Sequence, residues 1–181
     1  MRSSLRRLLA ALKREDVRAI SRRYFISNGF DGALTSVGIT VGSYLSGVPD
    51  GLTVFNVGIG GAIGLGTSGV WSVWEIERAE KRAELGRIER AMLVDLDETH
   101  LQRRQAGARR INAASSGLGP LIGIVLPLLP FLLEGALLEM WEATLLSVAI
   151  AVGILFSFGA YLAEISEQNW LVAGARMGLA G

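Results

Sequence analysis

One aspartate, Asp31, stands where an otherwise apolar, glycine-rich stretch begins. Small and polar residues recur around it in steps of three or four: Ser27, Asp31, Thr35, Gly38, Gly42 and Ser46. On a helix these positions share roughly a third of the circumference. A carboxylate on such a stripe inside a membrane predicts a cation or proton site on a pathway, and we include the neighbouring Asn28 in that pathway. The alternative is a helix-packing seam, in which Arg176 pairs with Asp31.

A second group of carboxylates lies further along the chain. Glu77, Glu80 and Glu84 share one helical face within about 60° of arc, and "DLDETH" then adds Asp95, Asp97, Glu98 and His100. Oxygen ligands with one imidazole suit divalent cations such as Mn²⁺, Fe²⁺ or Mg²⁺. The alternative is a solvated helix held by ion pairs. Residues 75–110 carry nine basic and eight acidic side chains, and Glu77 with Lys81 has the favourable spacing.

The composition excludes several other kinds of chemistry. There is no cysteine and only one histidine, so disulfides, thiolate metal sites and multi-histidine centres are absent from a single chain. No nucleophile–base set and no cofactor-binding loop is present. We therefore expect neither an enzyme nor a permanently bound cofactor, and no nucleic-acid partner.

The elements that must position these residues follow from the apolar blocks, which predict an all-α integral membrane protein with about five transmembrane helices. Residues 1–24 form an N-terminal amphipathic helix, with Leu5, Leu8, Leu9 and Leu12 at helical spacing. Residues 25–74 hold the first two spans, at 25–48 and 52–74. Residues 75–110 form a cytoplasmic extension of the second span. Residues 111–181 hold spans at 111–133 and 137–163, and a fifth that is incomplete, because its 12 residues from Trp170 are fewer than the roughly 20 needed.

The distribution of basic residues predicts the orientation. Eight of the 18 Lys and Arg residues precede the first span, nine lie between Arg78 and Arg110, and the loops at Pro49 and Glu134 have none. Positive residues accumulate on the cytoplasmic side of membrane proteins. The N-terminus and the charged segment are therefore expected in the cytoplasm.

Three stretches, in this order, carry a family likeness: "RRYFISNGFDGALTSVGITVGSY", "WEIERAEKRAEL" and "GPLIGIVLPLLPFLL". From about Arg22 to Gly181 the chain resembles the vacuolar iron transporter family, and most closely its small prokaryotic, mainly archaeal, members. The resemblance implies a five-helix protomer in a homodimer, located in a prokaryotic plasma membrane. The first helices would line a pathway at the dimer axis, through which Fe²⁺ or Mn²⁺ leaves the cytoplasm in exchange for protons. Asp31 matches the family's first-span aspartate in the pathway, and Glu77, Glu80 and Glu84 occupy its acidic cytoplasmic helix.

The chain departs from that family in its second span. The family usually carries a methionine and a glutamate where this chain has Gly66 and Val70. Two hypotheses therefore stand. In the first, the chain is a divalent-metal/proton antiporter in which Asp31, Glu77, Glu80 and Glu84 hold the metal. In the second, it is a membrane scaffold or interaction protein that keeps the fold without transport.

Overall fold

A computed structural model describes residues 15–92 and 100–180, and its regular elements are helical throughout. The helices are α2 (Glu15–Leu45), α3 (Gly51–Met92), α4 (His100–Leu128), the 3-10 helix η1 (Leu129–Leu133), α5 (Met140–Ile165) and α6 (Trp170–Gly178). The predicted all-α class is confirmed. The leucines of the expected N-terminal amphipathic helix lie outside the described residues, as do Asp95, Asp97 and Glu98.

In the part of the chain that the structure describes, three helical stretches are long and apolar enough to cross a membrane: Gly51–Ala91, Gly107–Leu133 and Met140–Ile165. They contain the second, third and fourth predicted spans. The 31-residue α2 is not among them, since its apolar half also carries Asp31 and several serines and threonines. Asp31, the residue that marks α2 as a candidate pathway, is thus one of those that lower its hydropathy.

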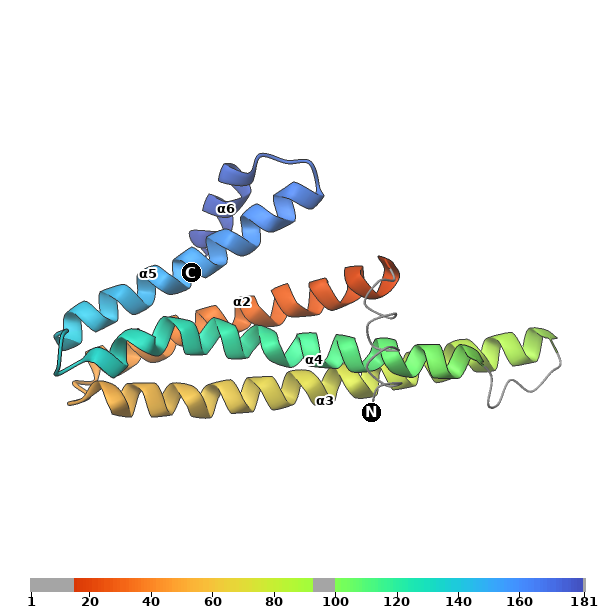
Figure 1. Cartoon of the computed structure of the whole chain (residues 1–181), viewed down its shortest axis with the longest axis horizontal. Coiled ribbons are helices and arrows are strands. Elements are labelled where there is room, and N and C mark those ends of the chain that lie inside the picture. Colours follow the sequence, from red (N-terminus) through yellow and green to blue (C-terminus); the bar gives the residue numbers. More distant parts are fainter. Residues whose placement is uncertain (1–14, 93–99, 181) are drawn as a thin grey trace, which may run out of the picture.

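The cytoplasmic segment expected at 75–110 is built from the ends of two long helices. The 42 residues of α3 span about 63 Å at 1.5 Å per residue, twice the thickness of a hydrocarbon core of about 30 Å. Figure 1 shows the far end of α3 running beside the start of α4 and projecting from the other helices. The predicted extension of the second span is therefore helical, and α4 accompanies it.

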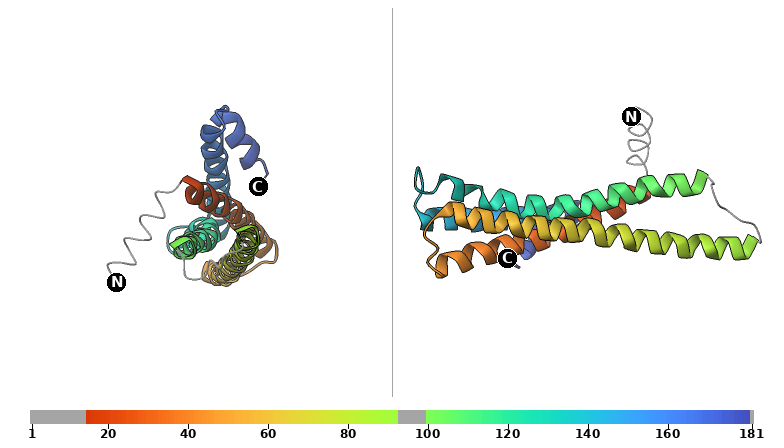
Figure 2. Two further views of the ribbon diagram at one scale, coloured as in Figure 1. Left: turned by 90° about the vertical axis from the view of Figure 1, so that its right-hand side faces the viewer. Right: turned by 90° about the horizontal axis from the view of Figure 1, so that it is seen from below.

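Helix α4 is the centre of the bundle, because it packs against both α2 and α3. Its contact with α2 is made by backbone atoms. A Cβ at Gly123 would lie 2.5 Å from the Gly29 carbonyl oxygen, and one at Gly32 would lie 2.7 Å from the Cα of Pro120. Small residues permit this close approach in membrane helices. Figure 2 shows α2, α3 and α4 grouped together, with α5 and α6 to one side.

The connections at the opposite end of the bundle are capped by acidic side chains. Asp50 accepts a hydrogen bond from the Thr53 amide at 2.8 Å and so caps α3. Glu139 and Glu142 form a capping box at the start of α5, which satisfies amides that the helix leaves free. The two glutamates that interrupt the fourth apolar block in the sequence are thus its N-terminal cap. After α5 the chain turns back, and α6 packs along it, where Gly159 lies against the Ala173 carbonyl.

Candidate functional site

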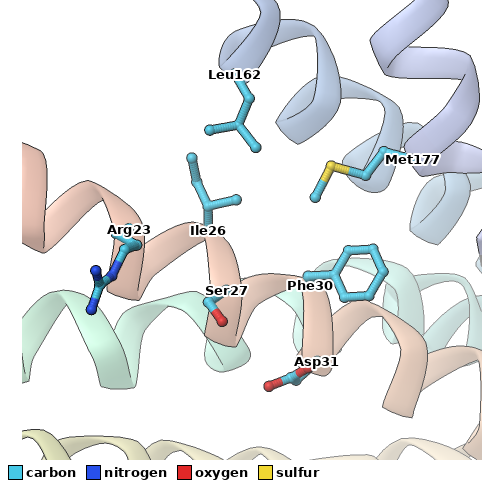
Figure 3. Close-up of a pocket in the computed structure, with 7 residues that line it drawn as sticks. All are labelled: Arg23, Ile26, Ser27, Phe30, Asp31, Leu162 and Met177. Carbon is cyan, nitrogen blue, oxygen red and sulfur yellow. The ribbon is translucent and has the colours of Figure 1, made fainter. Parts of the chain in front are cut away.

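Asp31 lies on an exposed face of α2, beside an opening of about 360 Å³ between α2, α5 and α6. Figure 3 shows Arg23, Ser27 and Asp31 following one another along α2. Ile26 and Phe30 point from the same helix toward Leu162 of α5 and Met177 of α6. The carboxylate is therefore at the edge of an otherwise mainly apolar opening.

Beyond Asp31, the glycines of the stripe have no packing partner among the described residues. A Cβ at Gly38 or at Gly42 would meet nothing within 4 Å, and both glycines are exposed. The Thr35 hydroxyl donates to the Asp31 carbonyl at 2.7 Å, and its methyl group lies beside Gly61 of α3. This face of α2 thus presents small residues that pack on nothing in the described part of the protomer.

Helix α3 continues that open surface. Gly60 and Gly64 are exposed, and added Cβ atoms would again meet nothing within 4 Å. Asn56, one turn before Gly60, and Ser68, one turn after Gly64, are exposed as well. Two neighbouring helices therefore each carry a row of small and polar residues without a packing partner in the described structure.

Asn28 does not belong to the open stripe. Its Nδ2 donates to the Ser116 hydroxyl, which in turn donates to the Gly69 carbonyl at 2.9 Å. These three residues come from α2, α4 and α3. Asn28 therefore joins the three central helices, and as positioned it faces the protomer interior rather than the exposed side of α2.

Arg176 forms no ion pair with Asp31 among the described residues, and the Arg78–Glu75 and Lys81–Glu84 ion pairs both lie on α3. It is exposed, and the residue of α6 that reaches the opening beside Asp31 is its neighbour Met177. Opposite charge suggested Arg176 as the partner of Asp31, whereas the uncharged Met177 carries no such signal. The reversal of the chain after α5 brings Met177 and Asp31 together.

The glutamates of the α3 extension have different surroundings. Glu77 is only 5% exposed, and its Oε1 accepts from Asn112 Nδ2 of α4 at 3.0 Å. Glu80 is exposed. Glu84 pairs with Lys81 at 2.7 Å, and this hydrogen bond raises the pKa of Lys81. Lys81 thus pairs with Glu84 and not with Glu77 as its spacing suggested.

These carboxylates do not form a metal centre within one protomer. Among the described residues, no three His, Cys, Asp or Glu side chains are grouped so that they could hold a metal ion. His100 opens α4, but its side chain is not among those described. Any coordination by these glutamates would therefore need side-chain movement or ligands from another source.

Comparison with known families shows to which family the chain belongs. Residues 75–181 match the model of the VIT family. That stretch is more than half of the chain and includes the end of α3 and all of α4, η1, α5 and α6. The chain belongs to the VIT family.

The VIT family comprises membrane transporters, and membership agrees with the three apolar spans. The chain is thus an integral membrane protein of an ion-transporter family. It is also similar to an uncharacterized protein of the archaeon Methanocaldococcus jannaschii, with 27% identity over 158 residues that cover 86% of this chain and 80% of the relative. No solved structure matches. The VIT match begins at residue 75, so Asp31 and the rest of α2 lie outside it.

Proposed function

We propose that this protein transports a divalent metal cation, Fe²⁺ or Mn²⁺, out of the cytoplasm in exchange for protons. Membership of the VIT family supports metal ion transport. The observation that carries the proposal is Asp31, an exposed carboxylate on a row of small residues that nothing in the described protomer covers. An ionisable side chain in such a position costs free energy and is most often functional.

The proposed exchange rests on competition at one carboxylate. A deprotonated Asp31 attracts a divalent cation, and a protonated Asp31 releases it. Metal and proton therefore each lower the affinity for the other, and this coupling is reciprocal. The carboxylates of the α3 extension would raise the local concentration of metal on the cytoplasmic side.

A single Asp31 cannot satisfy a divalent cation, because hard cations of this kind take about six oxygen or nitrogen ligands. We therefore propose a homodimer, in which the open faces of α2 and α3 meet their copies and two Asp31 carboxylates share one pathway. The spacing of Gly38 and Gly42 permits close helix approach in lipid. In this arrangement the N-terminus lies in the cytoplasm of a prokaryotic cell, and the protein lies in the plasma membrane.

A second candidate function is that of a membrane scaffold without transport. It is favoured by the hydrogen bond that holds Glu77 on Asn112 and by the ion pair that occupies Glu84. Gly66 and Val70, where the family resemblance leads one to expect a methionine and a glutamate, favour it too. In that case the charged ends of α3 and α4 would be a docking surface for another protein.

Metal uptake by proteoliposomes distinguishes the transporter from the scaffold. Vesicles that are acidic inside supply the proton gradient, and we expect Fe²⁺ or Mn²⁺ to enter as protons leave. Asp31→Asn keeps the size of the side chain but removes its charge, and we expect it to abolish uptake. The matched control is Glu164→Gln, an exposed carboxylate on α5 outside the stripe, which should transport normally. Absence of uptake by folded wild-type protein would favour the scaffold.

A further inference from the structure

A second opening lies on the other side of Ile26, between the beginning of α2 and the end of α5. Its volume is about 450 Å³. Helix α2 contributes Arg18 and Arg22, α4 contributes Ser115, and α5 contributes Tyr161. We call this opening the α2–α5 groove. None of the residues assigned above to metal transport lines it.

The groove carries two positive charges that no described acidic side chain neutralises. Arg18 and Arg22 are one helical turn apart, and none of the acidic side chains that the structure describes lines the opening. Within the described part of the chain neither guanidinium forms an ion pair. Of the acidic residues whose side chains are described, those next along the helices, Glu15 and Glu164, lie outside the lining. An anion in the groove would be attracted by both arginines at once.

Hydroxyl groups surround the arginines. Tyr161 and Ser115 have no hydrogen-bond partner among the described residues, so both can donate to an anion. Ser21 and Ser157 also line the groove, and each donates to a carbonyl of its own helix, Ser157 at 2.7 Å. Phosphate oxygens are strong acceptors, and arginine with hydroxyl donors is a chemically suitable set for them.

The remaining wall of the groove is apolar. Phe25 and Phe158 meet edge to face with their ring centres 5.9 Å apart, and Ile26 is buried beside them. Phe158 is held in place because it also packs against Gly29. A free phosphate ion would gain nothing from these rings. A phospholipid would gain from contact with the rings, since its acyl chain can cover Phe25 and Phe158 while its headgroup contacts the arginines.

We propose that the α2–α5 groove binds an acidic glycerophospholipid. Arg18, Arg22 and Tyr161 hold its phosphate, and Phe25 and Phe158 contact its acyl chain. Basic pockets between membrane helices on the cytoplasmic side are suited to anionic headgroups. A tyrosine at the membrane–water boundary is favourable as well. The lipid would fill the space where α5 diverges from α2 and would thereby fix the position of α5 and α6.

The test is lipid binding by the full chain in detergent, counted by native mass spectrometry. The protein is titrated with phosphatidylglycerol and, separately, with phosphatidylcholine. We expect phosphatidylglycerol to bind more tightly. Each arginine near an anionic headgroup is worth about fivefold in affinity, so Arg18→Gln with Arg22→Gln should weaken this binding on the order of 30-fold. Binding of phosphatidylcholine should not change.

A matched control removes two arginines elsewhere. Arg82→Gln with Arg87→Gln, both exposed on α3, should leave phosphatidylglycerol binding unchanged. An equal loss in that control, or equal binding of the two lipids by wild type, would overturn the proposal. Displacement of the lipid by excess inorganic phosphate would overturn it too, since the groove would then recognise the ion alone. If the double variant does not fold, Arg22→Gln alone should show the fivefold loss, and full binding by that variant would refute the site.

Discussion

Asp31 and Glu77 are both carboxylates within or beside an apolar bundle, yet their surroundings differ. Asp31 is exposed on an open face, whereas Glu77 is buried and receives a hydrogen bond from Asn112. A buried charge is tolerated only when it is hydrogen-bonded or paired. Asp31 is thus available to a ligand, and Glu77 is engaged in joining α3 to α4.

The first residue-scale prediction concerns that bond. Asn112→Ala leaves the Glu77 carboxylate buried without its donor, which should cost about 2–3 kcal/mol and lower the Tm by about 4–12 °C. Glu80→Ala, at an exposed position on the same helix, should change stability by no more than about 0.5 kcal/mol. Thermal unfolding in detergent measures both. Equal shifts in the two variants would show that the bond contributes nothing.

The second residue-scale prediction concerns pH. The hydrogen bond to Glu84 raises the pKa of Lys81 above its ordinary value of 10.5. A raised pKa in the folded state means that the pair stabilises α3 fully below pH 10.5 and is lost as the pH rises through the raised value. Because both side chains are substantially exposed, the contribution should be below about 1 kcal/mol.

Glu84→Gln should return the pKa of Lys81 toward 10.5, as followed by NMR titration of the labelled lysine side chain. Glu89→Gln is the comparison, on the same helix and further from Lys81. An unchanged Lys81 titration in Glu84→Gln would contradict the pairing.

At the scale of the elements, backbone contact between α2 and α4 organises the bundle. Helix α4 carries Gly119 and Gly123 against α2, and a Cβ at either would lie 2.5 Å from a backbone carbonyl oxygen of α2. Rigid backbone cannot move aside as a flexible side chain can. The α2–α4 contact should therefore tolerate added volume poorly.

Gly123→Ala should accordingly destabilise the protomer by about 1–3 kcal/mol, even though alanine favours helices over glycine. Gly153→Ala on α5 is the control, since a Cβ there would meet nothing within 4 Å. We expect it to be neutral or slightly stabilising. Thermal unfolding in detergent compares the stability of the two variants. Similar stability of Gly123→Ala and Gly153→Ala would argue against close α2–α4 packing.

At the scale of the whole molecule, the open faces of α2 and α3 bear on the proposed homodimer. If Asp31 belongs to a transport pathway, as proposed, that pathway needs walls on all sides, and a second copy of the chain would supply the wall over the stripe. The proposed homodimer therefore predicts the effect of a larger side chain at Gly42. A Cβ at this position would meet nothing within 4 Å among the described residues of its own chain.

Gly42→Leu should convert the dimer to monomer while leaving the helix content of each protomer unchanged, because a leucine would separate two helices in contact. Gly153→Leu, equally unobstructed within the protomer but on α5, should remain dimeric. Light scattering after size-exclusion chromatography reports the mass. A wild-type monomer, or a dimer that tolerates Gly42→Leu, would contradict this interface.

The family, the all-α class and three of the apolar spans could be read from the sequence, because they depend on local composition and on motifs close together in the chain. The sequence also predicted that α3 continues beyond its span, since its charged residues keep helical spacing. The role of Glu139 and Glu142 was harder to predict. In a sequence, a carboxylate that caps a helix looks the same as one that interrupts an apolar helix, and only backbone geometry distinguishes them.

Which residues meet across the bundle was decided by tertiary structure. Periodicity places Glu77, Glu80 and Glu84 on one face, but only the position of Asn112 on α4 buries the first and leaves the second exposed. Likewise, spacing puts Asn28 near Asp31, while its bond to Ser116 turns it inward. The reversal after α5 brings Met177, and not Arg176, to the opening beside Asp31. Helical spacing fixes which side chains share a face, and the packing of neighbouring helices determines which of those faces remain open.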